Sequence, residues 1–266
     1  FDTESSDRAF EEEVMLAGFA NASVKPEGSA VSFDSANETF TARYTHETIA
    51  LAFSITEEAI EDNLYDSIAK RYTKALARSM ANTKQVKAAA ILEGAFTTST
   101  GGDGVALCSD AHPVISGTFR NELAVSADLN ETSLEQSLID IAAMVDERGL
   151  KIAAKGTKMI IPSALQFTAE RLMKTANRVG TADNDINAIA SKGMIPQGYV
   201  VNNYLVDTDA FFIKTDVPNG LKMFQRAALK TAMEGDFDTG NVRYKARERY
   251  SFGFSDPRGI FGSPGV

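Results

Sequence analysis

The chain has 266 residues, of which 44% are hydrophobic and 24% are charged, and its formal net charge is −9. This composition excludes wholesale disorder and collagen-like repeats, and no stretch approaches the ~18 consecutive apolar residues of a membrane span. The length predicts one large domain, or two domains that share a chain crossing. The net negative charge argues against a protein whose main task is to bind the phosphate backbone of nucleic acids. The single cysteine, Cys108, cannot form an internal disulfide, which suits a reducing compartment.

The first 55 residues predict an amphipathic helix followed by a two-stranded ribbon. Phe10, Val14 and Ala17 recur at i, i+4 and i+7, which predicts a short helix over residues 7–19. Two runs then alternate apolar and polar residues in the way of half-buried strands: Phe40, Ala42, Tyr44 and Leu51, Phe53, Ile55. A hairpin or long ribbon fits residues 30–55. Such a ribbon is marginally stable alone, so we expect it to pack on another surface.

A long helix is predicted next. Ser54-Ile55-Thr56-Glu57 matches a capping box, and no Gly or Pro follows until Gly94. Apolar residues recur every four positions, at Ile60, Leu64, Ile68, Tyr72 and Leu76. Acidic residues near its start give way to basic ones, which complements the helix dipole. An unbroken helix would be ~60 Å long at ~1.5 Å per residue, so we interpret it as a strut whose expected kink is at Asn82-Thr83.

The middle of the chain predicts a surface excursion and then a compact α/β unit. Residues 97–131 are rich in Gly, Ser, Thr and Asp, which favours a long path over a surface. An amphipathic helix is expected over residues 133–148, with Gly149 as its stop. The remaining elements of the unit are a buried strand at 159–161, a helix at 164–175, and strands at 199–201 and 210–213.

The last segment alternates more regularly than any other. One face carries the apolar residues Val242, Tyr244, Ala246, Tyr250, Phe252 and Phe254. The other face carries the basic row Arg243, Lys245, Arg247 and Arg249. Three hypotheses fit this row: contact with DNA, contact with the acidic half of a neighbouring strut, or a solvated face that stops edge strands from pairing. We favour a contact between subunits.

Catalytic chemistry finds little support in the sequence. Cys108 and His112 lie four residues apart, but a metal needs three or four ligands and the only other histidine is His46. The alternative for this loop is that its polar residues cap turns. No Gly-rich phosphate loop, nucleophile elbow or zinc-binding histidine pair is present. We therefore expect no catalytic residue, cofactor or metal, and a hydrolase or metalloprotein centred on Cys108 and His112 remains the rival from another class.

Several short runs, in this order, resemble a known family. Residues 55–65 look like the entry to the spine helix of the Mu-type major head subunits, and Ser109-Asp110-Ala111-His112-Pro113 looks like the loop after that helix. Residues 145–149, 159–162 and 165–169 are similar to the axial domain of that family, and residues 247–254 and 256–262 to its closing strands. The chain thus resembles the major capsid proteins of tailed double-stranded DNA phages, whose fold is shared with encapsulin shells and the floor of herpesvirus capsids.

The resemblance implies an α+β fold with a defined division of the chain. Residues 1–29 would be an N-terminal arm and 30–55 an extended loop that reaches over a neighbouring subunit. Residues 56–130 would form a peripheral domain with a spine helix over 56–96, and 131–229 an axial domain around five- and six-fold axes. Residues 230–266 would return to the peripheral domain as closing strands.

The resemblance also implies partners and a location. The chain would pair with itself in pentamers and hexamers of an icosahedral capsid around phage DNA, in a virion assembled in the host bacterial cytoplasm without any membrane. Scaffold, portal and decoration proteins are further expected partners, and packaged DNA would be contacted without sequence specificity. The expected subunit contacts are Phe10, Val14, Phe40, Tyr44, Glu57, Glu61, Arg243, Lys245, Arg247, Arg249 and Arg258.

Two expectations limit this interpretation. Some members of the fold join subunits by lysine–asparagine isopeptide bonds from the extended loop, but residues 30–55 contain no lysine, so no such crosslink is expected there. An encapsulin-like compartment, which would enclose cargo enzymes instead of a genome, is the nearest alternative.

Overall fold

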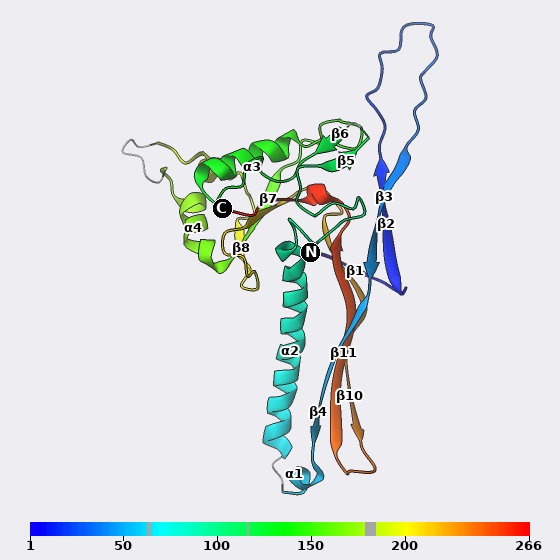
Figure 1. Cartoon of the computed structure of the whole chain (residues 1–266), viewed down its shortest axis with the longest axis vertical. Helices are drawn as coiled ribbons and strands as arrows, with labels where there is room; N and C mark the ends of the chain where they lie inside the picture. Colours follow the sequence, from blue (N-terminus) through cyan, green and yellow to red (C-terminus); the bar gives the residue numbers. More distant parts are fainter. Residues whose placement is uncertain (63–64, 116, 179–184) are drawn as a thin grey trace.

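A computed structural model of the chain describes residues 1–62, 65–115, 117–178 and 185–266. Its elements form three parts (Figure 1). A compact α/β unit lies at one side, a long helix runs beside a long sheet below it, and a two-stranded loop projects away from both. No helix among the described residues has the length and apolar character needed to cross a membrane.

The compact unit is a four-stranded sheet covered by short helices. Its strands are β7 (Gly156–Ile161), β8 (Tyr199–Val201), β9 (Phe211–Thr215) and β12 (Ile260–Ser263), in the order β12-β9-β7-β8. β8 runs parallel to β7, and the other pairs are antiparallel. The helices are α3 (Glu131–Ala143), η1 (Ser163–Leu165), α4 (Gln166–Lys174) and α5 (Ala188–Lys192). Strands were predicted at 159–161, 199–201 and 210–213 and a helix at 164–175, and all four are confirmed.

Two boundaries of this unit differ from expectation. The helix expected over residues 133–148 ends at Ala143. Gly149, at φ 82°, closes a turn in which its N–H donates to the carbonyl of Asp146, so it does not stop the helix. The last strand, β12, pairs with β9 in this sheet, although residues 230–266 were expected to belong together with the long strands.

The predicted strut is present in two pieces. Thr56 caps α1 (Glu57–Glu61) by accepting a hydrogen bond from the N–H of Ala59, and α2 (Tyr65–Glu93) follows. At ~1.5 Å per residue, α2 is about 44 Å long. The expected kink at Asn82-Thr83 is wrong, since α2 continues through it and Thr83 donates to the carbonyl of Ser79. Leu64 and the side chain of Ile68 lie outside the described residues.

The long sheet lies beside α2. Its order is β1 (Asp2–Ser5), β10 (Leu221–Gly235), β11 (Val242–Phe254) and β4 (Glu47–Ile55), with β1 parallel to β10 and the other pairs antiparallel. Leu76 and Met80 of α2 pack on Ala246, and Tyr72 contacts Phe53 edge-on. The predicted alternation of β11 is confirmed, because its apolar face meets α2 and its basic row lies on the opposite face. β10 was not foreseen.

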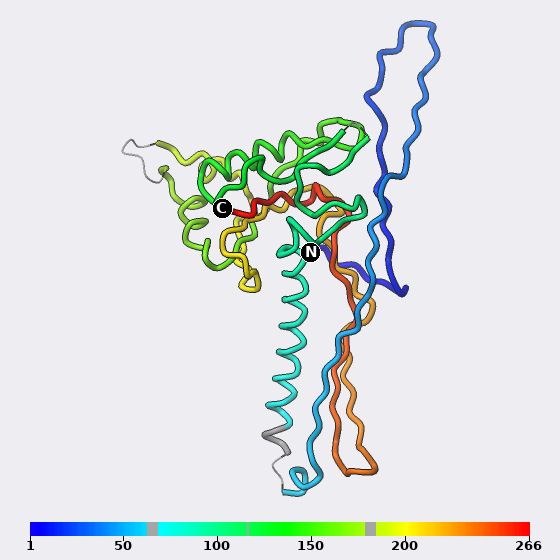
Figure 2. The backbone as a smooth tube through the Cα atoms, viewed as in Figure 1, coloured from blue at the N-terminus to red at the C-terminus, as the bar shows by residue number. Residues whose placement is uncertain are grey.

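The N-terminal prediction was wrong in two respects. Residues expected to form a helix form strand β2 (Phe10–Ala17), which pairs antiparallel with β3 (Asn37–Thr45). β3 and β4 do not form a hairpin with each other, because β4 joins β11 across the long sheet. The projecting loop is therefore β2, β3 and residues 18–36 between them, seen at the top of Figure 2. We call it the β2–β3 loop.

The stretch expected to run over the surface is partly interior. It contains the short pair β5 (His112–Val114) and β6 (Gly117–Phe119). Leu107, Cys108, His112 and Asn121 are all buried, so the expected surface path is wrong for this part of residues 97–131. Gly and Ser at these positions allow tight turns that bring the stretch against η2 (Pro257–Gly259) and β12.

Candidate functional site

Cys108 and His112, the cluster that invited a catalytic or metal hypothesis, lie in the interior. Burial raises the pKa of the Cys108 thiol well above its usual value, so the thiol stays protonated at neutral pH. Within the described ranges, no group of three His, Cys, Asp or Glu side chains is placed to hold a metal ion. His112 is hydrogen-bonded to Asp103 at 2.6 Å through Nδ1 and to Asn121 at 3.1 Å through Nε2. The geometry gives this cluster a structural role.

Asn121, which the sequence did not single out, connects this loop to the end of the chain. Its Nδ2 donates to the carbonyls of Leu107 at 2.6 Å, Pro257 at 2.8 Å and Ile260 at 3.2 Å. Its Oδ1 accepts from the N–H of Ser109 at 2.8 Å. The side chain is inaccessible to solvent, and the two hydrogens of its Nδ2 are shared among three carbonyls that lie far apart in the sequence.

The β2–β3 loop exposes an apolar surface. Its exposed apolar residues are Val14, Leu16, Phe19, Val24, Val31 and Phe33. Val24 is 93% and Phe33 98% exposed. Phe10 is partly covered by the guanidinium of Arg43, 3.9 Å from its ring centroid, and Phe40 is half-buried. An apolar surface of this kind marks an interaction site.

The base of the loop is fixed inside the chain. Tyr44 is buried: its ring packs edge-on against Phe224, and its hydroxyl is 2.5 Å from the Oγ of Ser255. Burial raises the pKa of Tyr44, so its hydroxyl stays neutral. The chain's own sheet thus covers Tyr44. That Tyr44 contacts another subunit stays a prediction.

Two further polar groups, missed by the sequence analysis, hold the same base. The buried ammonium of Lys222 pairs with Glu4 at 2.9 Å and with Glu13. Burial acts to lower the pKa of Lys222, but hydrogen bonds with both carboxylates outweigh it and raise the pKa. His46, between β3 and β4, is hydrogen-bonded to Ser6 at 2.8 Å and Ser251 at 3.0 Å. Only the tertiary structure brings these partners together.

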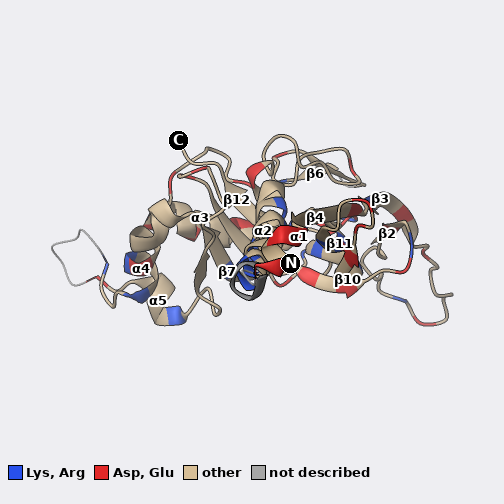
Figure 3. Cartoon of the chain, turned by 90° about the horizontal axis from the view of Figure 1, so that it is seen from below, with Lys and Arg blue, Asp and Glu red and all other residues tan. Residues whose placement is uncertain are grey.

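The basic row of β11 alternates with Ala246 and Tyr250, which meet α2, so the row lies on the opposite face of the strand. Figure 3 colours Lys and Arg blue along the chain. Lys245 and Arg247 are exposed, and no ion pair joins either of them to the described part of the chain. Arg243 pairs with Asp236 of the β10–β11 turn, and Arg249 is half-buried. Two members of the row are thus free for a partner.

The acidic start of the strut lies near the far end of the same sheet. Glu57 and Glu61 of α1 are exposed, and Glu57 lies against Gly240 in the β10–β11 turn. Neither carboxylate is ion-paired to a described residue. Both therefore stay available as expected contacts.

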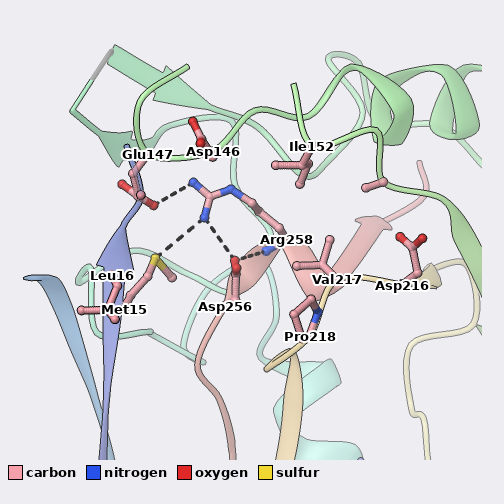
Figure 4. Close-up of a pocket in the computed structure, with 12 residues that line it drawn as sticks. Met15, Leu16, Asp146, Glu147, Ile152, Asp216, Val217, Pro218, Asp256 and Arg258 are labelled. Atoms are coloured by element: carbon pink, nitrogen blue, oxygen red, sulfur yellow. Dashed lines mark hydrogen bonds and ion pairs between the residues drawn. The ribbon is translucent and has the colours of Figure 1, made fainter. Parts of the chain in front are cut away.

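Arg258, another expected subunit contact, is also buried. It is only 4% exposed, and its guanidinium donates to Glu147 at 2.7 Å and to Asp256 at 3.3 Å (Figure 4). It also donates to the carbonyl of Val145 at 2.7 Å. The same group lies 4.3 Å from the ring centroid of Phe119. Burial raises the pKa of Asp256, although the charge of Arg258 acts in the opposite direction. Arg258 therefore joins parts of its own chain.

Comparison with known proteins adds a family and a fold. The sequence profile of a family described as "Phage capsid protein" matches residues 38–262. No curated protein matches the chain by sequence.

Solved structures match at low sequence identity. The capsid of cyanophage P-SCSP1u gives a TM-score of 0.60 at 15% identity, covering 100% of this chain and 85% of that chain. The capsid of Myoviridae phage XM1 gives 0.58 at 11% identity, covering 98% and 89%. The virus-like particle from Pyrococcus furiosus gives 0.56 at 12% identity, also covering 98% and 89%. At these identities the matches establish a common fold.

Proposed function

Because this chain belongs to the phage capsid protein family, we propose that it is the major shell subunit of a tailed phage and encloses its double-stranded DNA. Its role in the virion is structural. Copies would join head to tail into rings of five and six, and the rings would close into an icosahedral shell. The observation that carries this proposal is the family match over residues 38–262.

The β2–β3 loop would reach over a neighbouring copy. In its own chain the loop leaves Phe33, Val31 and Val24 in solvent, while Tyr44, Lys222 and His46 hold its base. A rigid base with an uncovered apolar tip suits an arm that docks on another molecule. Residues 30–55 contain no lysine, but they are only part of this loop. Lys25, which lies between β2 and β3, also belongs to it. That no crosslink forms from residues 30–55 stays a prediction.

The free cations of β11 would meet the acidic α1 of a neighbour. Lys245 and Arg247 face Glu57 and Glu61 in this proposal, and such complementary charges set register and orientation between copies more than they add affinity. Reversal of the cations to Glu should impair assembly, and combination with Glu57→Lys and Glu61→Lys should restore part of it. Impaired assembly without rescue would leave Lys245 and Arg247 with some other partner, DNA included.

The domain division follows from the same proposal. Residues 131–229 would lie around the five- and six-fold axes, and the strut with the long sheet between capsomers. Scaffold, portal and decoration proteins would be further partners, and assembly would take place in the host bacterial cytoplasm. The exposed surface of α4, with Phe167 72% exposed, suits contacts around an axis.

Sedimentation of the native protein, followed by electron microscopy of the fastest fraction, tests the proposal. Closed angular shells that contain DNA are expected. Shells filled with protein would favour a compartment of the encapsulin type, because the fold alone does not separate the two. A stable monomer under all assembly conditions would contradict the proposal.

A matched variant tests the role of the loop. Replacement of residues 19–35 by a short turn removes the exposed tip but keeps the pairing of β2 with β3. We expect a folded monomer that forms no closed shell. Truncation of residues 1–20 is a poorer test, because it also removes β1 and β2 from their sheets. Normal particles from the turn variant would rule out the proposed role of the tip.

A further inference from the structure

An acidic cavity lies beside the C-terminal end of β2. It has a volume of about 300 Å³ and is bounded by β2, by residues 146–154 and by residues 216–218 (Figure 4). Four carboxyl groups line it, those of Asp146, Glu147, Asp216 and Asp256, with Arg258 as the one lining cation. In Figure 4, Glu147 and Asp256 turn toward the guanidinium, while the carboxylate of Asp216 lies apart from it. The lining thus carries an excess of negative charge.

One buried oxygen in this lining has no partner. Glu147 is 4% exposed, and its Oε1 accepts from Arg258 at 2.7 Å. Its Oε2 is inaccessible and makes no hydrogen bond within the described residues. An unpaired buried carboxylate oxygen is unfavourable, and its charge adds to the negative potential of the lining. This oxygen is closed to solvent, whereas the carboxylates of Asp146 and Asp216 are accessible and have no ion pair with a described residue. A cation that enters the cavity would meet these two carboxylates.

The remaining walls are apolar. Met15 and Leu16 of β2 line one side, and Ile152, Val217 and Pro218 line others. Leu16 is 64% exposed at the rim. An acidic floor with apolar walls matches the long side chain of lysine or arginine, which has an apolar stem and a charged head. A bare metal ion fits less well, because the described carboxylates are not grouped as metal ligands.

We propose that this cavity is a socket for a lysine or arginine side chain of a second copy of this chain. This inference rests on the proposed function, which surrounds each subunit with other copies. The chain itself offers an exposed cation that the proposed contact with α1 does not use: Lys25 of the β2–β3 loop, which has no ion pair with a described residue. The partner that fills the socket would also cover Leu16, so one contact buries an apolar rim and neutralises an acidic floor.

The test removes charge from the socket without removing its local hydrogen bonds. Asp146 accepts the N–H groups of Arg148 and Leu150, and Asp216 accepts the N–H of Lys155. An Asn Oδ1 accepts the same bonds, so Asp146→Asn/Asp216→Asn keeps the turns. Asp207→Asn is the matched control, because Asp207 caps a turn in the same way but does not line the cavity.

Shell formation is measured by light scattering against protein concentration, at low and at high salt, with unfolding of the monomer followed in parallel. We expect the double variant to need about tenfold more protein for half-assembly at low salt, and to lose most of its salt dependence. The control should behave as the wild type, and monomer unfolding should be the same for all three proteins. Leu16→Ser should raise the required concentration at both salt levels.

The outcomes separate the inference from the proposed function. Wild-type protein that never forms shells contradicts the proposed function. Normal shells from wild type and double variant alike, with equal salt dependence, overturn the socket alone. Assembly that a divalent-cation chelator abolishes in wild type, but not in the double variant, would assign the cavity to a free metal ion and also overturn the inference.

Discussion

The β12-β9-β7-β8 sheet and the β2–β3 loop carry similar apolar side chains but bury them differently. Phe211, Ile213 and Phe261 of the sheet are inaccessible, because helices of the same chain cover it. Phe33 and Val24 of the loop are almost fully exposed. The compact sheet buries its apolar side chains within one chain, whereas those of the loop tip stay in solvent and, under the proposed function, would be covered by a neighbouring copy. Substitutions in the first should therefore affect folding, and substitutions in the second should affect assembly.

The largest effect on folding is expected at the centre of the compact sheet. Phe211→Ala should lower the free energy of unfolding by about 3–5 kcal/mol, because it removes buried apolar contacts and leaves a cavity. Urea denaturation of the unassembled protein measures this change. A loss below about 1 kcal/mol would mean that the compact unit is not the stable part of the chain.

Asn121→Ala should have the next largest effect. Its removal leaves the carbonyls of Leu107, Pro257 and Ile260 without their shared donor, and the expected loss is about 2–3 kcal/mol. Urea denaturation again applies, with the exposed Asn203→Ala as control. Equal stabilities for the two variants would show that the 97–131 stretch does not depend on this side chain.

A smaller effect should depend on pH at the base of the loop. Burial, and then the charge of Arg249, lower the pKa of His46, so the fold favours the neutral ring. The unfolded chain binds the proton more tightly, so the free energy of unfolding should be constant above the ordinary histidine pKa of about 6.5 and fall below it. Thermal unfolding between pH 7.5 and 5.5 measures this loss. His46→Gln should reduce the slope, and an unchanged slope would place its origin elsewhere.

The smallest effect on folding, with the sharpest contrast, is expected at the tip of the loop. Phe33→Ser should leave the free energy of unfolding within about 0.5 kcal/mol of wild type, because the ring contacts solvent in the single chain. Shell formation should nevertheless fall, as seen by sedimentation. Unimpaired shells would show that no neighbour covers the exposed ring. The exposure of the loop would then have no role in assembly.

Local sequence signals were sufficient to predict an element where one apolar face of that element packs on an apolar core. The strand at 159–161, the helix at 164–175 and the alternation of β11 follow from periodicity, because one apolar face meets a core. The boundary at β3 and β4 was also readable in principle. The residues around His46 include no Gly, Asn or Pro for a tight turn, whereas residues 18–36 include several. That signal favours a hairpin across 18–36, which is where the loop lies.

Other features depend on partners far along the chain. In β2 the side chains of Glu11, Glu13 and Met15 are the partly buried ones. In the sequence these glutamates resemble the polar side of a helix. In the structure Ser6 is hydrogen-bonded to Glu11, and Lys222 is paired with Glu13, which is why a strand can bury them. Arg258 and Tyr44 looked like free contacts because burial is a tertiary property.

The sequence by itself thus determined the periodic elements, the absence of a catalytic motif and the resemblance to phage capsid proteins. Only the tertiary structure decided which charges are buried and paired and which apolar residues stay uncovered. The reason is physical: periodicity reports one face of one element, whereas the environment of a side chain depends on segments up to some 240 residues away, as for Glu13 and Ser255.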